Sequence, residues 1–233
     1  MESTPSTFSN LSEFLKYLAA LPKDGDRRIP TLADLSHVLG ISTATLREQL
    51  EVARMMGIVE VRPKTGIRKL DYSFRPAVST SVAYAISQDT SNFGHFSDLR
   101  KHTEAAYFVE ASQRLSAPEI AALQQVVERA QEKVNGNTFQ LPNSEHREFH
   151  LMVYKHIDNP FVMGILETYW DLYRASGLEV YPDIHYLQRI WQYHARIADL
   201  IKSRDYAQGL NVLLEHMELI KQREKPSPRH SFE

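Results

Sequence analysis

The chain has 233 residues, of which 42% are hydrophobic, and this is enough apolar material for one large domain or two modest ones. A formal net charge of −2 argues against an indiscriminate polyanion binder. Cysteine is absent, which excludes disulfides and thiolate metal sites, and no apolar run reaches the roughly 18 residues of a membrane span. The N-terminal stretch MESTPSTFSNLSEFL lacks the features of a signal peptide, so we expect a cytoplasmic protein without membrane contacts.

The N-terminal segment has the pattern of a helix-turn-helix. The stretch TLADLSHVLG predicts a helix that Thr31 caps and Gly40 ends. The stretch STATLREQLEVARMMG predicts a longer helix, which Ser42 caps and Gly57 ends. A short helix, a turn and a longer helix make this motif. An amphipathic helix over residues 8–21 is expected to precede it, with an apolar stripe of Phe8, Leu11, Leu15, Leu18 and Leu21.

Two short strands are predicted directly after the third helix. Residues 58–61 and 67–70 alternate in polarity, and the turn RPKTG joins them into a hairpin, the wing of a winged helix-turn-helix. Hydroxyl and basic side chains at the start of the third helix and in the wing suit base edges and phosphates. A purely structural module is the alternative, but these polar positions have no role in a core. The predicted DNA-binding residues are Ser42, Thr43, Thr45, Arg47, Arg62, Lys64, Thr65, Gly66 and Arg68.

The run RRIPTLADLSHVLGISTATLREQLEVARMMGIVEVRPKTG resembles the winged helix-turn-helix of the GntR family of bacterial repressors. The resemblance implies a homodimer that binds double-stranded operator DNA of two-fold symmetry. Two positions depart from the family pattern. Thr43 stands where the family usually has a DNA-contacting arginine, and Leu32-Ala33 replaces the usual Glu-Arg, so the usual operator core is not expected. The matching residues are Ile29, Pro30, Leu35, Gly40, Ile41, Ser42, Leu46, Arg47, Glu48, Leu50, Gly57, Ile58, Val59 and Gly66.

The fold class predicted for the whole chain is mostly α, with three helices and a β-hairpin followed by an all-helical antiparallel bundle. Residues 72–81 contain Pro and Ser and show little periodicity, so we expect a linker there, between a DNA-binding domain of residues 8–71 and a bundle of residues 82–223. Residues 224–233 are expected to be a flexible tail. The bundle helices are expected at 82–88, 96–114, 117–134, 144–157, 161–176, 183–203 and 206–223. Side chains expected to face inward from the second of these are Leu99, Ala106, Phe108 and Val109.

Three stretches of this bundle resemble the FCD effector domain of the FadR subfamily: DLRKHTEAAYFVEAS, SEHREFHLMVYKHIDNP and HARIADLIKSRDYAQGLNVLLEH. Together with the DNA-binding part, the resemblance covers roughly residues 10–222. It implies a domain that binds an effector and forms the dimer. It also places Arg100 in the effector cavity, where a guanidinium is suited to bidentate binding of a carboxylate. The alternative for Arg100 is a surface salt bridge with Glu104. Aromatic residues that either line this cavity or belong to the core are Tyr107, Tyr169, Tyr173 and Trp191.

Four histidines stand at the positions that bind metal in metal-binding FCD domains. His146 and His150 are one helical turn apart, and His194 and His216 fall on the last two predicted helices. The first pair alone is weak evidence, because a solvated or hydrogen-bonded histidine is commoner than a ligand. His146 replaces the family's aspartate, so it either becomes a fourth ligand or swings out of the site. Ligation by nitrogen alone favours Zn²⁺ or Ni²⁺ as the divalent ion.

These patterns predict a dimeric transcription regulator with a metal-centred pocket for a small organic acid. One alternative is a metal sensor, in which the ion itself is the signal. A metal-dependent enzyme is disfavoured, because the chain has no H-E-x-x-H motif and Glu148 falls off the face that carries His146 and His150. The histidines expected at the surface or in loops are His37, His95, His102, His156, His185 and His230.

Overall fold

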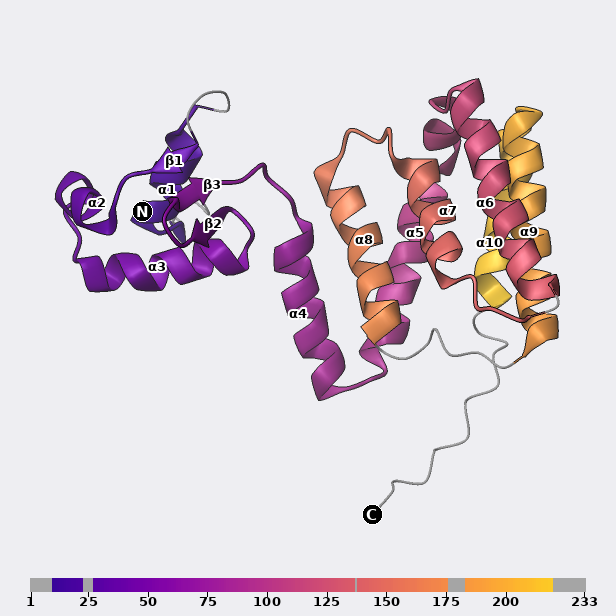
Figure 1. Ribbon diagram of the computed structural model, residues 1–233, viewed down its shortest axis with the longest axis horizontal. Coiled ribbons are helices and arrows are strands. Elements are labelled where there is room, and N and C mark those ends of the chain that lie inside the picture. The colour runs from indigo at the N-terminus through magenta and orange to yellow at the C-terminus, as the bar shows by residue number, and fades with distance from the viewer. Residues whose placement is uncertain (1–9, 23–26, 137, 176–182, 220–233) are drawn as a thin grey trace, which may run out of the picture. The chain divides into compact units, whose positions relative to one another are not determined.

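The computed structural model describes residues 10–22, 27–136, 138–175 and 183–219, which fold into two compact units, Met1–Tyr84 and Ala85–Glu233 (Figure 1). The described part of the first unit is a winged helix-turn-helix, as predicted. A three-stranded antiparallel sheet, in the order β1-β3-β2, accompanies its helices. Its elements are α1 (Glu13–Ala20), β1 (Arg28–Ile29), α2 (Leu32–Leu39), α3 (Thr43–Met55), β2 (Val59–Arg62) and β3 (Gly66–Lys69).

The predicted caps set the bounds of α2 and α3. Thr31 Oγ1 accepts a hydrogen bond from Asp34 N at 3.2 Å, and Ser42 Oγ accepts one from Thr45 N at 3.1 Å. A cap of this kind contributes about 1 kcal/mol to helix stability. Gly40 then ends α2 in the left-handed conformation, with φ of +68°. Local side-chain chemistry therefore places the turn between the two helices.

The core of this unit differs in α1 from the predicted stripe. The helix begins at Glu13 because Ser12 caps it, so Leu11 precedes the helix and is 38% exposed. Leu15 and Leu21 are only partly buried, and Phe14 occupies the centre instead. Phe8 lies outside the described residues. The buried apolar residues are Phe14, Leu18, Ile29, Leu35, Leu46, Leu50, Ala53, Val59 and Ile67.

Residues 72–81, expected as a linker, include the first turns of a helix, α4 (Arg75–Gln88). Pro76 lies in its first turn, where a proline breaks no helical hydrogen bond. The division between the two compact units falls inside this helix, after Tyr84. The Pro76 ring also packs against Gly57, in the turn that ends α3. The contact is so close that a Cβ added to Gly57 would lie 2.5 Å from Pro76 Cγ.

We expect Gly57→Ala to destabilise the DNA-binding unit by about 1–3 kcal/mol, measured by urea unfolding of the full chain. The substitution combines a left-handed backbone, with φ of +68°, and a clash with the Pro76 ring. Gly40→Ala is the matched control, because Gly40 has the same φ but no atom within 4 Å of the added Cβ. Equal losses in the two variants would show that the Pro76 contact contributes nothing.

The described part of the second unit is a helical bundle, as predicted (Figure 1). Helix α9 packs against α6 and α10, while α5 packs against α7, α8 and α10. Asp205 caps the last helix by accepting a hydrogen bond from Gln208 N at 3.2 Å. Within the described ranges no helix has both the length and the apolarity to cross a membrane. The helices after α4 are α5 (Asn92–Gln113), α6 (Ala117–Asn135), α7 (Asn143–Tyr154), α8 (Pro160–Ala175), α9 (Ile184–Lys202) and α10 (Tyr206–Glu218).

The inward face of α5 also differs from the predicted one. Leu99 is 48% exposed, Ala106 is exposed and Val109 is partly buried, so only Phe108 of the expected residues reaches the core fully. The apolar pattern was misleading because two charged residues of α5 pair with each other and can therefore be buried. The observed inward stripe consists of Phe96, Arg100, Glu104, Phe108, Ala111 and Ser112. The end of the last predicted helix, the loop before α9 and the expected tail at 224–233 are not among the described residues.

Candidate metal centre

The four predicted histidines meet in the interior of the bundle. Helix α7 carries His146 and His150 on one face, while α9 contributes His194 and α10 contributes His216. One ligand nitrogen from each ring lies within 4.8 Å of the other three. His150, His194 and His216 are buried and His146 is partly buried. Segments separated by up to 70 residues thus present four imidazoles to one point.

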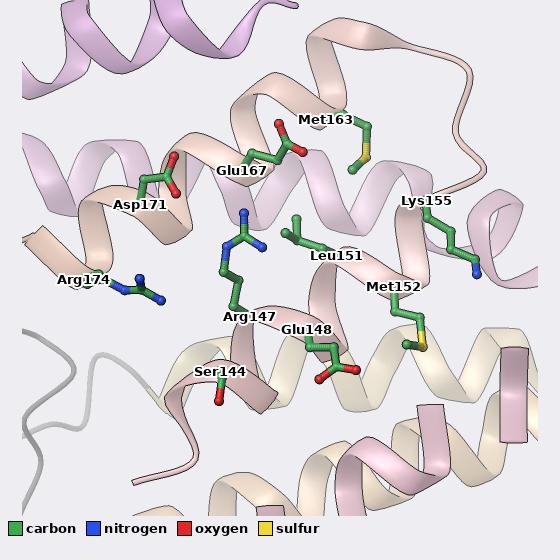
Figure 2. Close-up of a pocket in the computed structure, with 10 residues that line it drawn as sticks. All are labelled: Ser144, Arg147, Glu148, Leu151, Met152, Lys155, Met163, Glu167, Asp171 and Arg174. Carbon is green, nitrogen blue, oxygen red and sulfur yellow. The ribbon is translucent and has the colours of Figure 1, made fainter. Parts of the chain in front are cut away.

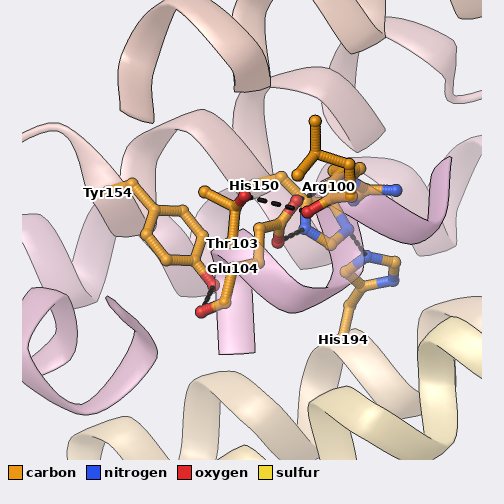
Figure 3. Close-up of polar contacts among 7 residues, drawn as sticks. Arg100, Thr103, Glu104, His150, Tyr154 and His194 are labelled. Atoms are coloured by element: carbon orange, nitrogen blue, oxygen red, sulfur yellow. Dashed lines mark hydrogen bonds and ion pairs between the residues drawn. The ribbon is translucent and has the colours of Figure 1, made fainter. Parts of the chain in front are cut away.

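Hydrogen bonds fix the tautomers of the two central imidazoles. His150 Nδ1 lies 2.8 Å from Glu104 Oε2 (Figure 3). His194 Nδ1 lies 2.9 Å from the Ile190 carbonyl oxygen. A carboxylate and a carbonyl oxygen only accept, so both rings carry the proton on Nδ1. Both Nε2 atoms therefore hold lone pairs, and these two atoms face each other at 3.2 Å.

This arrangement suits a divalent cation. Two facing lone pairs repel each other unless a positive charge lies between them. Two nitrogens bound to one Zn²⁺ at about 2.0–2.1 Å, at the tetrahedral angle, are about 3.3 Å apart. His146 Nε2 and His216 Nδ1 are also buried, and neither has a hydrogen-bond partner in the described part of the chain. The donor set therefore fits a transition metal that prefers nitrogen.

Burial keeps these imidazoles in the form that binds metal. It lowers the pKa of His146, His150 and His216 well below 6.5, and the neighbouring rings and Arg100 lower it further. Burial also lowers the pKa of His194, to about 3. All four rings are therefore neutral at pH 7, as a metal ligand must be.

A buried ion pair lies beside the cluster. Arg100 Nε donates to Glu104 Oε1 at 2.5 Å, and both side chains are at most 8% exposed. The salt bridge expected as the alternative for Arg100 is therefore present, but in the interior rather than at the surface. Burial disfavours the charged guanidinium, but the Glu104 carboxylate raises the pKa of Arg100. Burial raises the pKa of Glu104, and the charge of the Arg100 guanidinium opposes this effect. The hydrogen bonds that its two oxygens accept favour the carboxylate form.

The guanidinium of Arg100 is held between aromatic rings and keeps one donor unused. Its Cζ lies 4.2 Å from the ring centre of Tyr169 and 4.8 Å from that of Trp170. Arg100 Nη2 has no hydrogen-bond partner among the described residues. Tyr169 and Trp191 are core residues, whereas Tyr107 and Tyr173 are partly buried. A small anion that reached this point would find a buried donor and a positive charge.

The predicted DNA-binding residues all lie in the first unit, at the start of α3 and in the wing. Each of them is exposed except Thr43, which is half-buried. Ser42 Oγ is also the helix cap and lies 3.0 Å from Thr45 Oγ1. The wing turn contains two left-handed residues, Lys64 with φ of +69° and Gly66 with φ of +76°. This backbone turns the chain sharply between β2 and β3.

Comparison with known proteins establishes the family. Residues 96–219, more than half of the chain, match the FCD domain. The chain is a GntR-family transcription regulator with an FCD effector domain. It is 22% identical over 199 residues to the uncharacterized HTH-type transcriptional regulator YcbG of Bacillus subtilis, covering 84% of this chain and 80% of that protein. It is 21% identical over 222 residues to the Uxu operon regulator of Haemophilus influenzae, covering 92% and 80%.

A solved structure has a similar fold. The structure of Streptococcus agalactiae GntR superimposes with a TM-score of 0.61 at 17% identity, covering 90% of this chain and 94% of that one. The family and the fold of the FCD regulator are thus those of transcription regulators. Glu148, which lies between His146 and His150 in the sequence, pairs with Arg129 at 2.8 Å, and both of these side chains are exposed.

A groove of about 660 Å³ lies apart from the histidines, on the outer side of α7 and α8 (Figure 2). The side chains of Arg147, Glu167 and Asp171 point into the same part of it, and Leu151 and Met163 contribute apolar surface. None of the four histidines, nor Arg100, lines it. This groove of the FCD regulator is therefore distinct from the interior site.

The structure adds Arg28 to the basic residues of the wing sheet. Arg28 is the cross-strand partner of Arg68 on β3, and both are exposed. The sequence alone did not single out Arg28, because it could equally be an ordinary solvated residue.

We expect the metal-free FCD regulator to lose stability as the pH falls below about 6.5. The histidine pKa is 6.5 in the unfolded chain and lower in the folded one, so the unfolded chain binds more protons below pH 6.5. The stabilisation from neutral histidines is thus complete above pH 6.5 and decreases towards about pH 3. Urea unfolding of chelator-stripped protein between about pH 7.5 and pH 5 measures this loss. Stability that is constant or rising over this range would contradict the expectation.

Proposed function

We propose that this regulator binds a two-fold operator as a homodimer and senses a small carboxylate effector at a site built around a divalent metal ion. The observation that carries the proposal is the pair of neutral imidazoles with facing Nε2 atoms, 3.2 Å apart. His146, His150, His194 and His216 would hold the ion, with Zn²⁺ or Ni²⁺ favoured by four nitrogen donors. A divalent ion supplies positive charge to which a carboxylate oxygen binds. Arg100 would bind the same carboxylate through its unused Nη2.

The output of the regulator is DNA binding. Two copies related by a two-fold axis would place two recognition helices and two wings on the half-sites of one operator. An effector that binds one arrangement of the dimer better than another would shift the population towards it. The residues proposed to contact DNA are Ser42, Thr43, Thr45, Arg47, Arg62, Lys64, Thr65, Gly66 and Arg68, together with Arg28.

Two measurements test this function. Elemental analysis of the purified protein should find close to one divalent ion per chain. Gel-shift titration with the DNA upstream of its own operon should show a sequence-specific complex whose affinity changes with one member of a panel of small carboxylates. A protein that shows no sequence-specific shift with any ligand is not the proposed regulator. A sequence-specific shift that no carboxylate alters would remove the effector class and keep the DNA function.

The second candidate function is sensing of the metal itself. Four nitrogens are enough for a closed tetrahedral site, which leaves no position for an organic ligand. Titration of Zn²⁺ or Ni²⁺ into chelator-stripped protein separates the two functions. If the ion alone changes DNA affinity, it is the signal. If it changes only the melting temperature, it is a structural ion or a platform for the effector.

We expect Arg28→Gln to weaken DNA binding by a similar factor on all sequences. The loss of one phosphate contact should reduce the slope of log K against log salt concentration by about 0.9. Arg54→Gln is the control, because Arg54 is also exposed but lies in the last turn of α3, at the opposite end from the residues proposed to contact DNA. Fluorescence anisotropy at several salt concentrations gives both slopes. An unchanged slope in Arg28→Gln would exclude the sheet face from the DNA contact.

A further inference from the structure

Glu104 is buried in the centre of the bundle although it is charged. The residue is 0% exposed, and both carboxylate oxygens and the backbone carbonyl oxygen accept hydrogen bonds (Figure 3). Oε1 accepts from Arg100 Nε, Oε2 accepts from His150 Nδ1, and its backbone carbonyl accepts from Tyr154 Oη at 3.0 Å. Side chains from α5 and α7 thus hold one carboxylate in a single orientation. An apolar residue would fill this position at a lower cost in desolvation, so packing alone does not explain a glutamate here.

We propose that Glu104 is the positioning residue of the metal centre, fixing His150 as the Nδ1–H tautomer with Nε2 directed at the other imidazoles. This inference rests on the proposed metal function. A carboxylate bonded to the outer nitrogen of a ligating histidine sets the ring orientation and makes the inner nitrogen a stronger donor. His194 uses a backbone carbonyl, that of Ile190, for the same purpose. The carboxylate is thus the one charged group that orients a ring of this cluster among the described residues.

Arg100 connects Glu104 to the point where the carboxylate effector is proposed to bind. Its Nε holds Glu104, while its Nη2 remains without a partner among the described residues. One guanidinium therefore binds the positioning carboxylate along one edge and offers a buried donor along the other. An anion bound at Nη2 would be linked to the His150 imidazole through Arg100 and Glu104.

The variant that tests the proposal is Glu104→Gln. A glutamine either accepts from His150 Nδ1 with less negative charge or donates to it, and donation would place the proton on the metal-facing nitrogen. We expect Zn²⁺ affinity, measured by competition with a chromophoric chelator, to fall by about 10- to 100-fold. The absorption spectrum of the Co²⁺-loaded protein should change as well, because it reports the ligand field.

The matched control is Glu119→Gln. Glu119 also bonds an imidazole, His156 Nε2 at 2.8 Å, but at the surface of the same bundle. Its removal should leave Zn²⁺ affinity at the wild-type value. Because Glu104→Gln leaves Arg100 buried without its partner, the double variant Arg100→Met/Glu104→Gln provides a neutral pair if the single variant fails to fold. Weak Zn²⁺ binding by the folded double variant supports the proposal.

Wild-type Zn²⁺ affinity in either folded Glu104 variant overturns the proposal. Failure of the proposed function gives a different result, because the wild-type protein itself would then bind no metal. In that case ¹⁵N NMR of the histidine side chains in the metal-free protein still tests the positioning role. A His150 signal of the Nδ1–H tautomer that changes in Glu104→Gln supports it. A tautomer that is the same in both proteins overturns it.

Discussion

Replacement of His150 by alanine is expected to abolish retention of stoichiometric metal. His150 is 1% exposed and its Nε2 lies 3.2 Å from that of His194, so its removal eliminates one of the two central donors. Affinity should fall by more than about 100-fold, because changes outside the coordination sphere alone cost about 10- to 100-fold. Elemental analysis after gel filtration, followed by Zn²⁺ competition with a chelator, measures the effect.

The control for His150→Ala is His156→Ala on the same chain. His156 follows α7 but is exposed and bonded to Glu119, so metal content should match the wild type. His150→Ala also leaves Glu104 without one of its partners, and the folded state is therefore checked by circular dichroism. A folded His150→Ala protein that still carries close to one ion per chain would show that the cluster is not the metal site.

Replacement of Arg100 by methionine is expected to lower the free energy of unfolding by about 3–5 kcal/mol. The substitution leaves Glu104 buried, charged and without its cation, while the methionine fills much of the vacated volume. The double variant Arg100→Met/Glu104→Gln should regain most of this loss, because both charges are then absent. Urea unfolding of metal-free protein isolates the ion pair from any contribution of the ion.

An exposed pair of the same kind provides the comparison for Arg100→Met. Arg129 pairs with Glu148 at 2.8 Å, and both side chains are more than 40% exposed. Water screens such a pair, so Arg129→Met should cost less than about 1 kcal/mol. If Arg100→Met costs no more than Arg129→Met, the interior pair has no special energetic role. The Arg100→Met protein should also lose any thermal shift that a small carboxylate produces in the wild type.

Elements that depend on local chemistry were predictable from the sequence. The helix-turn-helix followed from caps at Thr31 and Ser42 and from Gly40, each acting over three or four residues. The wing followed from alternating residues and a turn rich in Pro and Gly. The strand β1 was missed because Arg28 and Ile29 are paired by tertiary contact with β3 rather than by any pattern of their own.

Burial of charge is what the sequence did not disclose. Hydrophobic periodicity favoured Leu99 and Ala106 as the inward side of α5, whereas Arg100 and Glu104 occupy it. A charged residue is buried only when its partners are present, and the partner of Glu104 on α7 is 46 residues away. The R-x-x-x-E spacing was visible in the sequence, but it did not indicate that the glutamate contacts a histidine of the cluster.

The helix α4 has a practical consequence for building hybrid regulators. The sequence alone would place the junction of a chimera in the expected linker, residues 72–81. A junction placed before Pro76 would separate Gly57 from Pro76 and replace the proline ring that lies against the turn after α3. A junction after Tyr84 keeps that contact within one parent, because the division between the compact units falls there. The transplanted part should therefore include the first ten residues of α4.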